Sequence, residues 1–396
     1  MSPFGKSLEF VNEKDLQALL DSGFAENRFV EYKLKLPGRA DADKREFVKD
    51  VVSFANSAGG HIIYGIEAVS GIPKKFHGIP ASQVDEEKLR LEQILRTSID
   101  PIIHGLKIQA VALSDGNIVL IIEIPRGLFG PHMIRGRGSF TSRNSAGKME
   151  MDFSEVRAAF TGAETAVSKL QDFRAERTAK LAGGEEFIRL QSGGCILLHL
   201  LPLESFTLGF RCQLERISNR KTRQLLQLRE TFLDWVPHFS FDGFTQIFKP
   251  ELRTLPGIAY AHVFRNGALE YVDTETPERY GDKTLRPGFF EITVLAATKK
   301  FFGVVKQLEL RGPFFVFASF LKCGNWSLVI PPENYRDADI KPIGRDNLIL
   351  PEVYLESEAS DLELAFRPAF DVLWNTCGWE SSKSYDKDGK YSEQWQ

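Results

Sequence analysis

The chain has 396 residues, of which 43% are hydrophobic and 26% charged, and its formal net charge is −3. This length predicts two domains, and the composition excludes a disordered protein. The slightly acidic balance means that any surface for nucleic acid must be local.

No apolar run approaches the ~20 residues of a membrane span, and the N-terminal residues lack the apolar segment of a signal peptide. The four cysteines lie far apart without a C-x-x-C pair, which argues against a zinc knuckle or a disulfide framework. We therefore expect a reduced, cytoplasmic protein that does not associate with a membrane.

The first 150 residues alternate between predicted strands and helices. The expected elements are a strand at 29–36, a helix from residue 43 that Gly59 and Gly60 end, a buried strand at 61–67, a helix at 84–99, a β-hairpin at 106–125 and a short strand at 138–143. This mixed order predicts an α+β fold.

Four segments describe the expected domain organisation. They are an N-terminal domain of residues 1–152, a charged helical connector at 153–184, a second α+β domain at 185–380 and a mobile tail at 381–396. Within the second domain, helices are expected at 215–235 and 289–308.

Charged residues surround the first predicted strand. Glu31 and Lys33 alternate with apolar residues in "FVEYKLKLP", so both side chains share one face. Glu26 lies just before this strand and Glu67 ends the next one, so the three acids converge if the strands are neighbours. Converging carboxylates need a cation, and oxygen ligands suit Mg²⁺ or Mn²⁺, while Lys33 can stabilise charge on a phosphate. Such a set equips a phosphodiester nuclease, and an ordinary salt bridge is the alternative interpretation.

A basic window spans residues 126–148 and contains no acid. Its cations are Arg126, Arg135, Arg137, Arg143 and Lys148. Because His132 and Phe140 lie among them, the window suits RNA phosphates and unstacked bases. A solvated loop is the alternative.

Nucleotide binding has weaker support. The chain lacks the G-x-x-x-x-G-K-[ST] pattern of a P-loop, and the Gly59-Gly60 pair follows a helix C-terminus, which has the wrong dipole end for a phosphate. Asn56 and His61 flank this pair and are placed to face the acids, although His61 at a strand start is more often structural.

The run "ENRFVEYKLKLP" followed by "FVKDVVSFANSAGGHIIYGIEAVSGIPKKFHGI" resembles the Schlafen AlbA-like domain, as does the downstream "PHMIRGRGSFTSRNSAGKM". The resemblance covers about residues 20–160, and the F-A-N-x-x-G-G element is its most specific part. The second half resembles the C-terminal part of bacterial proteins built on this domain, which indicates no chemistry.

The resemblance implies an N-terminal mixed sheet with flanking helices. Some members of the family are metal-dependent endoribonucleases that cut transfer RNA with three acids, which match Glu26, Glu31 and Glu67 here; the third is usually Asp. The resemblance thus implies Glu26, Glu31 and Glu67 as metal ligands and catalytic acids. The residues themselves add Lys33 as a catalytic residue, and Lys33, Asn56 and the basic window as the nucleic-acid contacts.

Three hypotheses follow for function. The first is a Mg²⁺- or Mn²⁺-dependent endoribonuclease acting on tRNA-like RNA, which the resemblance places in bacterial phage defence or stress response. The second is a non-catalytic regulator that binds RNA or DNA, and the third is a sensor that binds ATP or another nucleotide.

We also expect a homodimer or a higher homo-oligomer, because a single AlbA-like domain offers only one basic edge to a folded RNA. The connector carries apolar residues for such an interface, namely Phe153, Val156, Phe160, Val167, Leu170 and Phe173. The alternative is that these residues pack on their own two domains.

Overall fold

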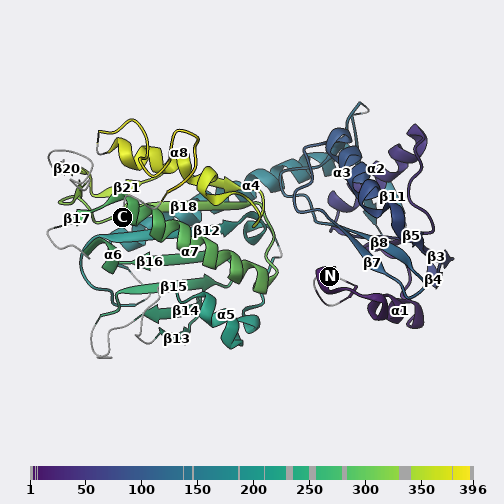
Figure 1. Ribbon diagram of the computed structural model, residues 1–396, viewed down its shortest axis with the longest axis horizontal. Coiled ribbons are helices and arrows are strands. Elements are labelled where there is room, and N and C mark those ends of the chain that lie inside the picture. Colours follow the sequence, from purple (N-terminus) through teal and green to yellow (C-terminus); the bar gives the residue numbers. More distant parts are fainter. Residues whose placement is uncertain are drawn as a thin grey trace. The chain divides into compact units, whose positions relative to one another are not determined.

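The computed structural model of the chain has an α+β fold, as the sequence predicts (Figure 1). It describes residues 3–392 except residues 5, 7, 137, 145–146, 186–187, 209, 229–234, 249–255, 279–282, 330–339 and 377. The chain divides into two compact units, Met1–Thr165 and Ala166–Gln396. Within the described residues, no helix has both the length and the apolar character needed to cross a membrane.

The first unit contains a mixed five-stranded sheet, a four-stranded antiparallel sheet and a hairpin. The five-stranded sheet has the order β1-β2-β8-β5, with β7 also paired to β8. Its strands are β1 (Val30–Lys33), β2 (Gly60–Tyr64), β5 (Ile79–Pro80), β7 (Lys107–Ala112) and β8 (Asn117–Ile124). Strands β1 and β2 are parallel, and the other pairs are antiparallel. The expected hairpin at 106–125 is therefore present as β7 and β8.

The remaining strands of the first unit lie outside this sheet. The four-stranded sheet joins β6 (Ile99–Asp100), β9 (Met133–Ile134), β10 (Ser139–Asn144) and β11 (Gly147–Glu150), and the hairpin joins β3 (Ile66–Val69) to β4 (Ile72–Phe76). The helices are α1 (Glu13–Asp21), α2 (Asp41–Ala55) and α3 (Val84–Ser98), with short 3-10 helices at Leu8–Phe10 and Ala81–Gln83.

Alternation along the strands gives the five-stranded sheet two apolar faces. In β8, Leu120 and Ile122 belong to the core beneath α2 and α3, whereas Val119 and Ile121 belong to the core beneath α1. Figure 1 shows these helices on opposite sides of the sheet. Burial of both faces explains why β8 is an almost continuous apolar run.

Glycine is required at positions 59 and 60 for a different reason from the expected one, which was to end the helix. Helix α2 ends earlier, with Asn56 as its C-cap. A Cβ on Gly59 would lie 2.7 Å from the carbonyl oxygen of Ile124, and one on Gly60 would lie 2.5 Å from that of Phe29. Glycine is therefore required because neighbouring backbone comes too close for any side chain.

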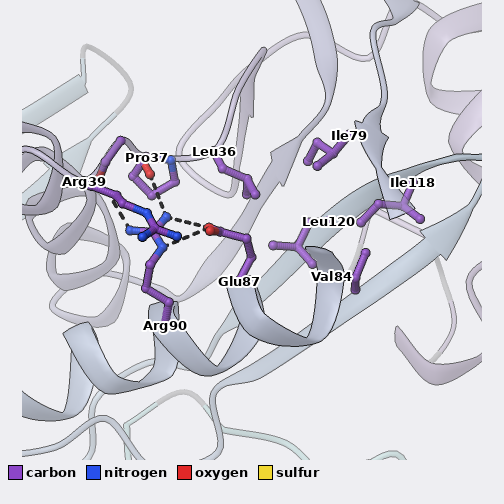
Figure 2. A pocket seen from close by; sticks show the side chains of 10 residues that line it. Leu36, Pro37, Arg39, Ile79, Val84, Glu87, Arg90, Ile118 and Leu120 are labelled. Carbon is purple, nitrogen blue, oxygen red and sulfur yellow. Dashed lines mark hydrogen bonds and ion pairs between the residues drawn. The ribbon is translucent and has the colours of Figure 1, made fainter. Parts of the chain in front are cut away.

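A cavity of about 260 Å³ lies on the α2/α3 side of the first unit (Figure 2). The loop after β1, helix α3 and strand β8 contribute lining residues. None of its lining residues is among those that the sequence predicts for function.

The second unit is built on an eight-stranded antiparallel sheet with the order β13-β14-β15-β16-β12-β18-β21, and β22 also pairs with β18. Its strands are β12 (Cys195–Pro202), β13 (Trp235–Phe239), β14 (Gly243–Phe248), β15 (Ala259–Phe264), β16 (Leu269–Asp273), β18 (Phe314–Leu321), β21 (Asn347–Ile349) and β22 (Val353–Leu355). A small sheet joins β17 (Thr284–Leu285), β19 (Ser327–Val329) and β20 (Ile340–Pro342).

Helix α7 (Pro287–Leu308) packs on one face of the large sheet, with a core of phenylalanine and aliphatic side chains. The other helices of this unit are α5 (Arg220–Leu225), α6 (Glu275–Glu278) and α8 (Leu362–Asn375), with 3-10 helices at Leu203–Phe206 and Leu214–Ser218. The helix expected at 215–235 is wrong in extent over the described residues, and residues 229–234 of it lie outside them. The helix expected at 289–308 corresponds to α7.

Helix α4 (Phe153–Ala182) occupies the segment expected to be a connector. The boundary between the two units falls inside this helix. Of the apolar residues proposed for a dimer, Phe153 is 80% exposed, but Leu170 is buried and Phe173 contacts the rings of Phe206 and Phe264. Part of that apolar set is therefore used within the second unit.

Part of the tail that was expected to be mobile packs against α8 in the residues that the structure describes, and its mobility stays a prediction. Ser382 and Ser384 are buried, and the hydroxyl of Tyr385 donates a hydrogen bond to the carbonyl of Glu363 in α8. Residues 393–396 lie outside the described residues.

Candidate nucleic-acid interface

Strand β1 directs two charged side chains toward α2. Val30 and Tyr32 belong to the core beneath α1, so the alternating residues Glu31 and Lys33 face the opposite side. Lys33 Nζ lies 2.6 Å from Glu31 Oε1 and 3.1 Å from Asp50 Oδ2, and Asp50 belongs to α2. One ammonium group thus joins two carboxylates from different elements.

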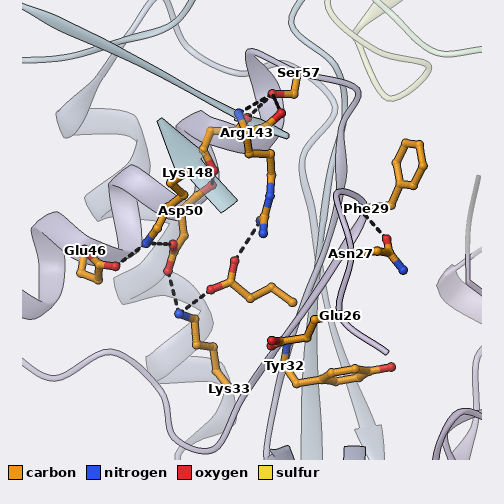
Figure 3. Close-up of polar contacts among 12 residues, drawn as sticks. Glu26, Asn27, Phe29, Tyr32, Lys33, Glu46, Asp50, Ser57, Arg143 and Lys148 are labelled. Carbon is orange, nitrogen blue, oxygen red and sulfur yellow. Dashed lines mark hydrogen bonds and ion pairs between the residues drawn. The ribbon is translucent and has the colours of Figure 1, made fainter. Parts of the chain in front are cut away.

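Strands β10 and β11 bring two more cations to the same place. Arg143 NH1 lies 2.9 Å from Glu31 Oε2, and its guanidinium stacks 3.9 Å from the ring centre of Phe54. Lys148 Nζ forms ion pairs with both Asp50 and Glu46. Figure 3 shows Lys148 between Glu46 and Asp50, and Lys33 on the other side of Asp50.

Six side chains therefore form an unbroken series of ion pairs, which we call the ion chain. In order, its members are Glu46, Lys148, Asp50, Lys33, Glu31 and Arg143. Anions and cations alternate, so the series is neutral in total. It ties α2, β1, β10 and β11 together.

Burial and neighbouring charges compete in setting the pKa values of the ion chain. Burial would raise the pKa of Glu31, but Lys33 and Arg143 outweigh it and hold that pKa below its ordinary value. Burial would lower the pKa of Lys33, but Asp50 and Glu31 raise it to about 12. For Asp50, which is only 1% exposed, burial and the charge of Glu31 raise the pKa despite its two lysine partners.

The structure does not gather the three predicted acids. Glu67 lies on β3 and pairs with Lys75 of β4, with a distance of 3.2 Å between Oε2 and Nζ. Glu26 Oε1 accepts a hydrogen bond from the backbone N–H of Tyr32. In the described part of the chain, no three His, Cys, Asp or Glu residues are grouped to hold a metal ion. Glu26, Glu31 and Glu67 are thus not grouped as metal ligands among the described residues, and the Mg²⁺ or Mn²⁺ site stays a prediction.

The physical reason is the path of the chain after β2. Glu31 is in register with Ile62, and Gly65, with φ of 95°, turns the chain out of the sheet before Glu67. Glu67 therefore belongs to a separate hairpin rather than to the strand beside β1.

Asn56 has a structural role in the same region. Its side chain donates to the carbonyls of His132 and Thr141 and accepts from the N–H of His132. It therefore fixes the segment around β9 and β10 to the end of α2, and its amide is occupied. His61 is buried on the α1 side, with its ring against Phe4, so it faces away from Glu31.

The basic window separates into two groups. Arg126 and Arg135 are exposed, and Arg135 has one distant ion pair, 3.7 Å from Asp100. Arg143 and Lys148 are largely buried members of the ion chain. Arg137 lies outside the described residues.

Sequence reasoning missed Asp50 and Glu46. Asp50 could have been found, because it falls on the apolar stripe of α2 formed by Phe47, Val51 and Phe54. An acid at a core position of an amphipathic helix requires a cationic or hydrogen-bonding partner. Glu46 is exposed and gives no such signal.

Residues 26–152, about a third of the chain, match the family model described as Schlafen, AlbA_2. The assignment confirms the resemblance based on the F-A-N-x-x-G-G element. No curated protein matches the chain significantly.

Two solved structures are similar to part of the chain. One is the DIP2311 protein from Corynebacterium diphtheriae, with 17% identity over 35% of this chain and 29% of that chain, and a TM-score of 0.25. The other is the N-terminal domain of a putative ATP-dependent DNA helicase RecG-related protein from Nitrosomonas europaea, with 17% identity over 34% of this chain and 88% of that chain, and a TM-score of 0.28.

Proposed function

We propose that the first unit binds nucleic acid, with structured, tRNA-like RNA as its main partner and DNA as a second one. The Schlafen AlbA_2 assignment supports a function related to nucleic acid. The observation that carries the proposal is the clustering of Lys33, Arg143 and Lys148, from three different strands, around Asp50 and Glu31.

The ion chain is neutral, but its lysines retain donor capacity. An ammonium group has three N–H donors, and Lys33 and Lys148 each use two of them in the described ion pairs. Their side chains are 31% and 21% exposed. Carboxylates on either side therefore hold each ammonium in a fixed position, with one donor left for a phosphate oxygen. Arg126 and Arg135 provide the exposed charge that attracts the polymer.

Fluorescence anisotropy with labelled tRNA, duplex RNA and duplex DNA tests this proposal. Binding should weaken linearly in log K against log salt between roughly 50 and 200 mM, because phosphate contacts release counterions. Absence of binding to all three polymers at low salt would contradict it.

Metal-dependent cleavage of RNA is a second proposal, with Mg²⁺ or Mn²⁺ as the cofactor and phage defence or stress response as the setting. A specific feature favours it: Glu31 and Asp50 already converge on one cation, the Lys33 ammonium. Incubation of tRNA with the protein and Mn²⁺, with and without a chelator, tests it. Intact tRNA under every condition would contradict cleavage and leave nucleic-acid binding as the only proposed activity.

We further propose that the chain forms a homodimer, which would present two basic edges to one folded RNA. The exposed Phe153 supports this proposal. Light scattering at micromolar concentration tests it, and a monomeric mass with and without RNA would contradict it.

A further inference from the structure

The cavity on the α2/α3 side has aliphatic walls and one polar end. The wall residues are Leu36, Ile79, Val84, Ile118 and Leu120. Figure 2 shows these side chains on one side of the cavity, and Arg39, Glu87 and Arg90 together on the other. A ligand here would therefore have apolar faces and a polar edge.

The polar end is held in place by its own hydrogen bonds. Glu87 Oε2 accepts from Nε and NH2 of Arg90 at 2.9 and 2.7 Å, and NH2 also donates to the carbonyl of Pro37 at 2.7 Å. NH1 makes only a 3.5 Å contact with the carbonyl of Gly38. Among the described contacts, Glu87 Oε1 therefore remains as an acceptor and Arg90 NH1 as a weakly used donor, so the polar end offers one group of each kind.

The size of the cavity limits the ligand. Pockets for whole drug-sized ligands have volumes of roughly 300–1,000 Å³, so a cavity of about 260 Å³ takes only a fragment. A nucleobase is such a fragment, since its faces are apolar and its edge carries adjacent donors and acceptors. A purely apolar side chain would leave the Glu87–Arg90 pair without a polar partner and partly desolvated.

The cavity lies on the same face of the sheet as the ion chain. Lys33 is in register with Tyr64, and Tyr64 with Leu120, so the three side chains form one row across β1, β2 and β8. Two strand spacings amount to about 10 Å, which one nucleotide spans from its phosphate to its base. Tyr64 stands between the two sites: burial and the charges of Asp50 and Glu31 raise its pKa, and Arg90 acts in the opposite direction.

We infer that this cavity binds one unstacked nucleobase, whose phosphate lies toward Lys33. The inference rests on the proposed function and extends it, because it adds a base-binding site to a surface that contacts phosphates. The base can come from single-stranded nucleic acid or from a free mononucleotide.

Two measurements test the inference. The first compares binding of a short single-stranded RNA with the same RNA carrying abasic sites, for the wild-type chain, Val84→Phe and Leu89→Phe. Val84 lines the cavity, whereas Leu89 lies on the same helix and is exposed. The second follows the methyl NMR signals of Ile79, Ile118 and Leu120 in the wild-type chain. Separate titrations use the four common nucleoside monophosphates and the RNA oligonucleotide, which avoids any dependence on variant folding.

The wild-type chain and Leu89→Phe should bind the RNA with bases roughly 5- to 100-fold more tightly than the abasic RNA. Val84→Phe should lose this difference and keep its affinity for the abasic RNA. Methyl shifts with mononucleotides would identify free nucleotide as a ligand source, and shifts with the oligonucleotide alone would identify single strands. Equal affinity for both RNAs, without methyl shifts from any ligand, would overturn the inference while leaving phosphate binding intact. Failure of all RNAs to bind would overturn the proposed function, and methyl shifts with mononucleotides would then still support the cavity as a base site.

Discussion

Asp50 is the residue on which the ion chain depends, because it contacts both Lys33 and Lys148 from a buried position. Removing the Asp50 charge leaves Lys33 with Glu31 and Lys148 with Glu46 as their only described carboxylate partners, and breaking a buried pair is costly. Asp50→Asn should therefore lower the free energy of unfolding of the first unit by about 3 kcal/mol. Urea denaturation followed by far-UV circular dichroism measures this change.

Glu46→Gln is the matched control, since Glu46 binds the same Lys148 but is 59% exposed. Exposed ion pairs contribute at most about 1 kcal/mol. All five tryptophans lie in the second unit. A transition that appears in circular dichroism but is absent from tryptophan fluorescence therefore belongs to the first unit. Equal losses for the two variants would show that burial of Asp50 does not control the network.

Glu31→Gln addresses the second proposal. If the chain cleaves RNA, this substitution should abolish cleavage. Affinity for RNA should remain or increase by roughly fivefold, because a negative charge is removed near the phosphates. Cleavage of tRNA in the presence of Mn²⁺ and anisotropy measurements provide the two readouts.

Glu67→Gln is the informative comparison, because Glu67 pairs with Lys75 on a separate hairpin. The structure predicts nearly unchanged activity for it. If Glu26→Gln, Glu31→Gln and Glu67→Gln all abolish cleavage, the three acids act together and the sequence-based triad is right in solution. Full activity in all three would remove the nuclease proposal.

At the level of elements, the two groups of cations in the basic window should behave differently. Arg126 and Arg135 are exposed, so the double change to Ala should lower the slope of log K against log salt by roughly 1 to 2 units for any RNA sequence. Lys14→Ala, on α1 at the opposite face of the sheet, is the control and should leave the slope unchanged. An unaltered slope in the double variant would show that these arginines do not contact phosphates.

Secondary structure in the first unit was largely predictable from periodicity. The alternation in β1 placed Glu31 and Lys33 on one face, and the apolar stripe of α2 predicted its buried side. The position of Glu67 was not predictable, because a single positive-φ glycine, Gly65, decides whether the strand continues beside β1 or leaves it. Long-range partners such as Arg143 for Glu31 also lack a local sequence signal.

On the scale of the whole molecule, two of the buried acids in the second unit, Glu270 and Glu291, have opposite electrostatic environments. Glu270 bonds to Arg177, His199 and Tyr260. Burial opposes its charge, but His199 and Arg177 prevail and hold its pKa below the ordinary 4.5. This stabilisation is present above pH 4.5 and is lost as the pH falls below that value.

Glu291 is a buried acid whose pKa is raised rather than lowered. Its Oε1 accepts hydrogen bonds from Trp374 Nε1 and Ser382 Oγ, which connects α7 to α8 and to the tail. Burial, with a smaller contribution from the charge of Asp371, raises its pKa to about 7. The folded state therefore holds a proton that the unfolded chain releases above pH 4.5, so stability decreases as the pH rises from 4.5 to about 7 and then stays level.

Glu291→Gln should remove this loss, because an amide keeps the acceptor oxygen and does not ionise. Relative to the wild-type chain, the variant should gain roughly 3 kcal/mol of unfolding free energy between pH 4.5 and pH 8. Glu270→Gln is the control of opposite sign: it should be less stable by about 3–5 kcal/mol at pH 8, because Arg177 stays buried without its anion, and this deficit should shrink below pH 4.5. Tryptophan fluorescence in urea at several pH values measures both, since every tryptophan lies in this unit. A stability difference between Glu291→Gln and the wild-type chain that does not change with pH would mean that the pKa of Glu291 is not raised in the folded state.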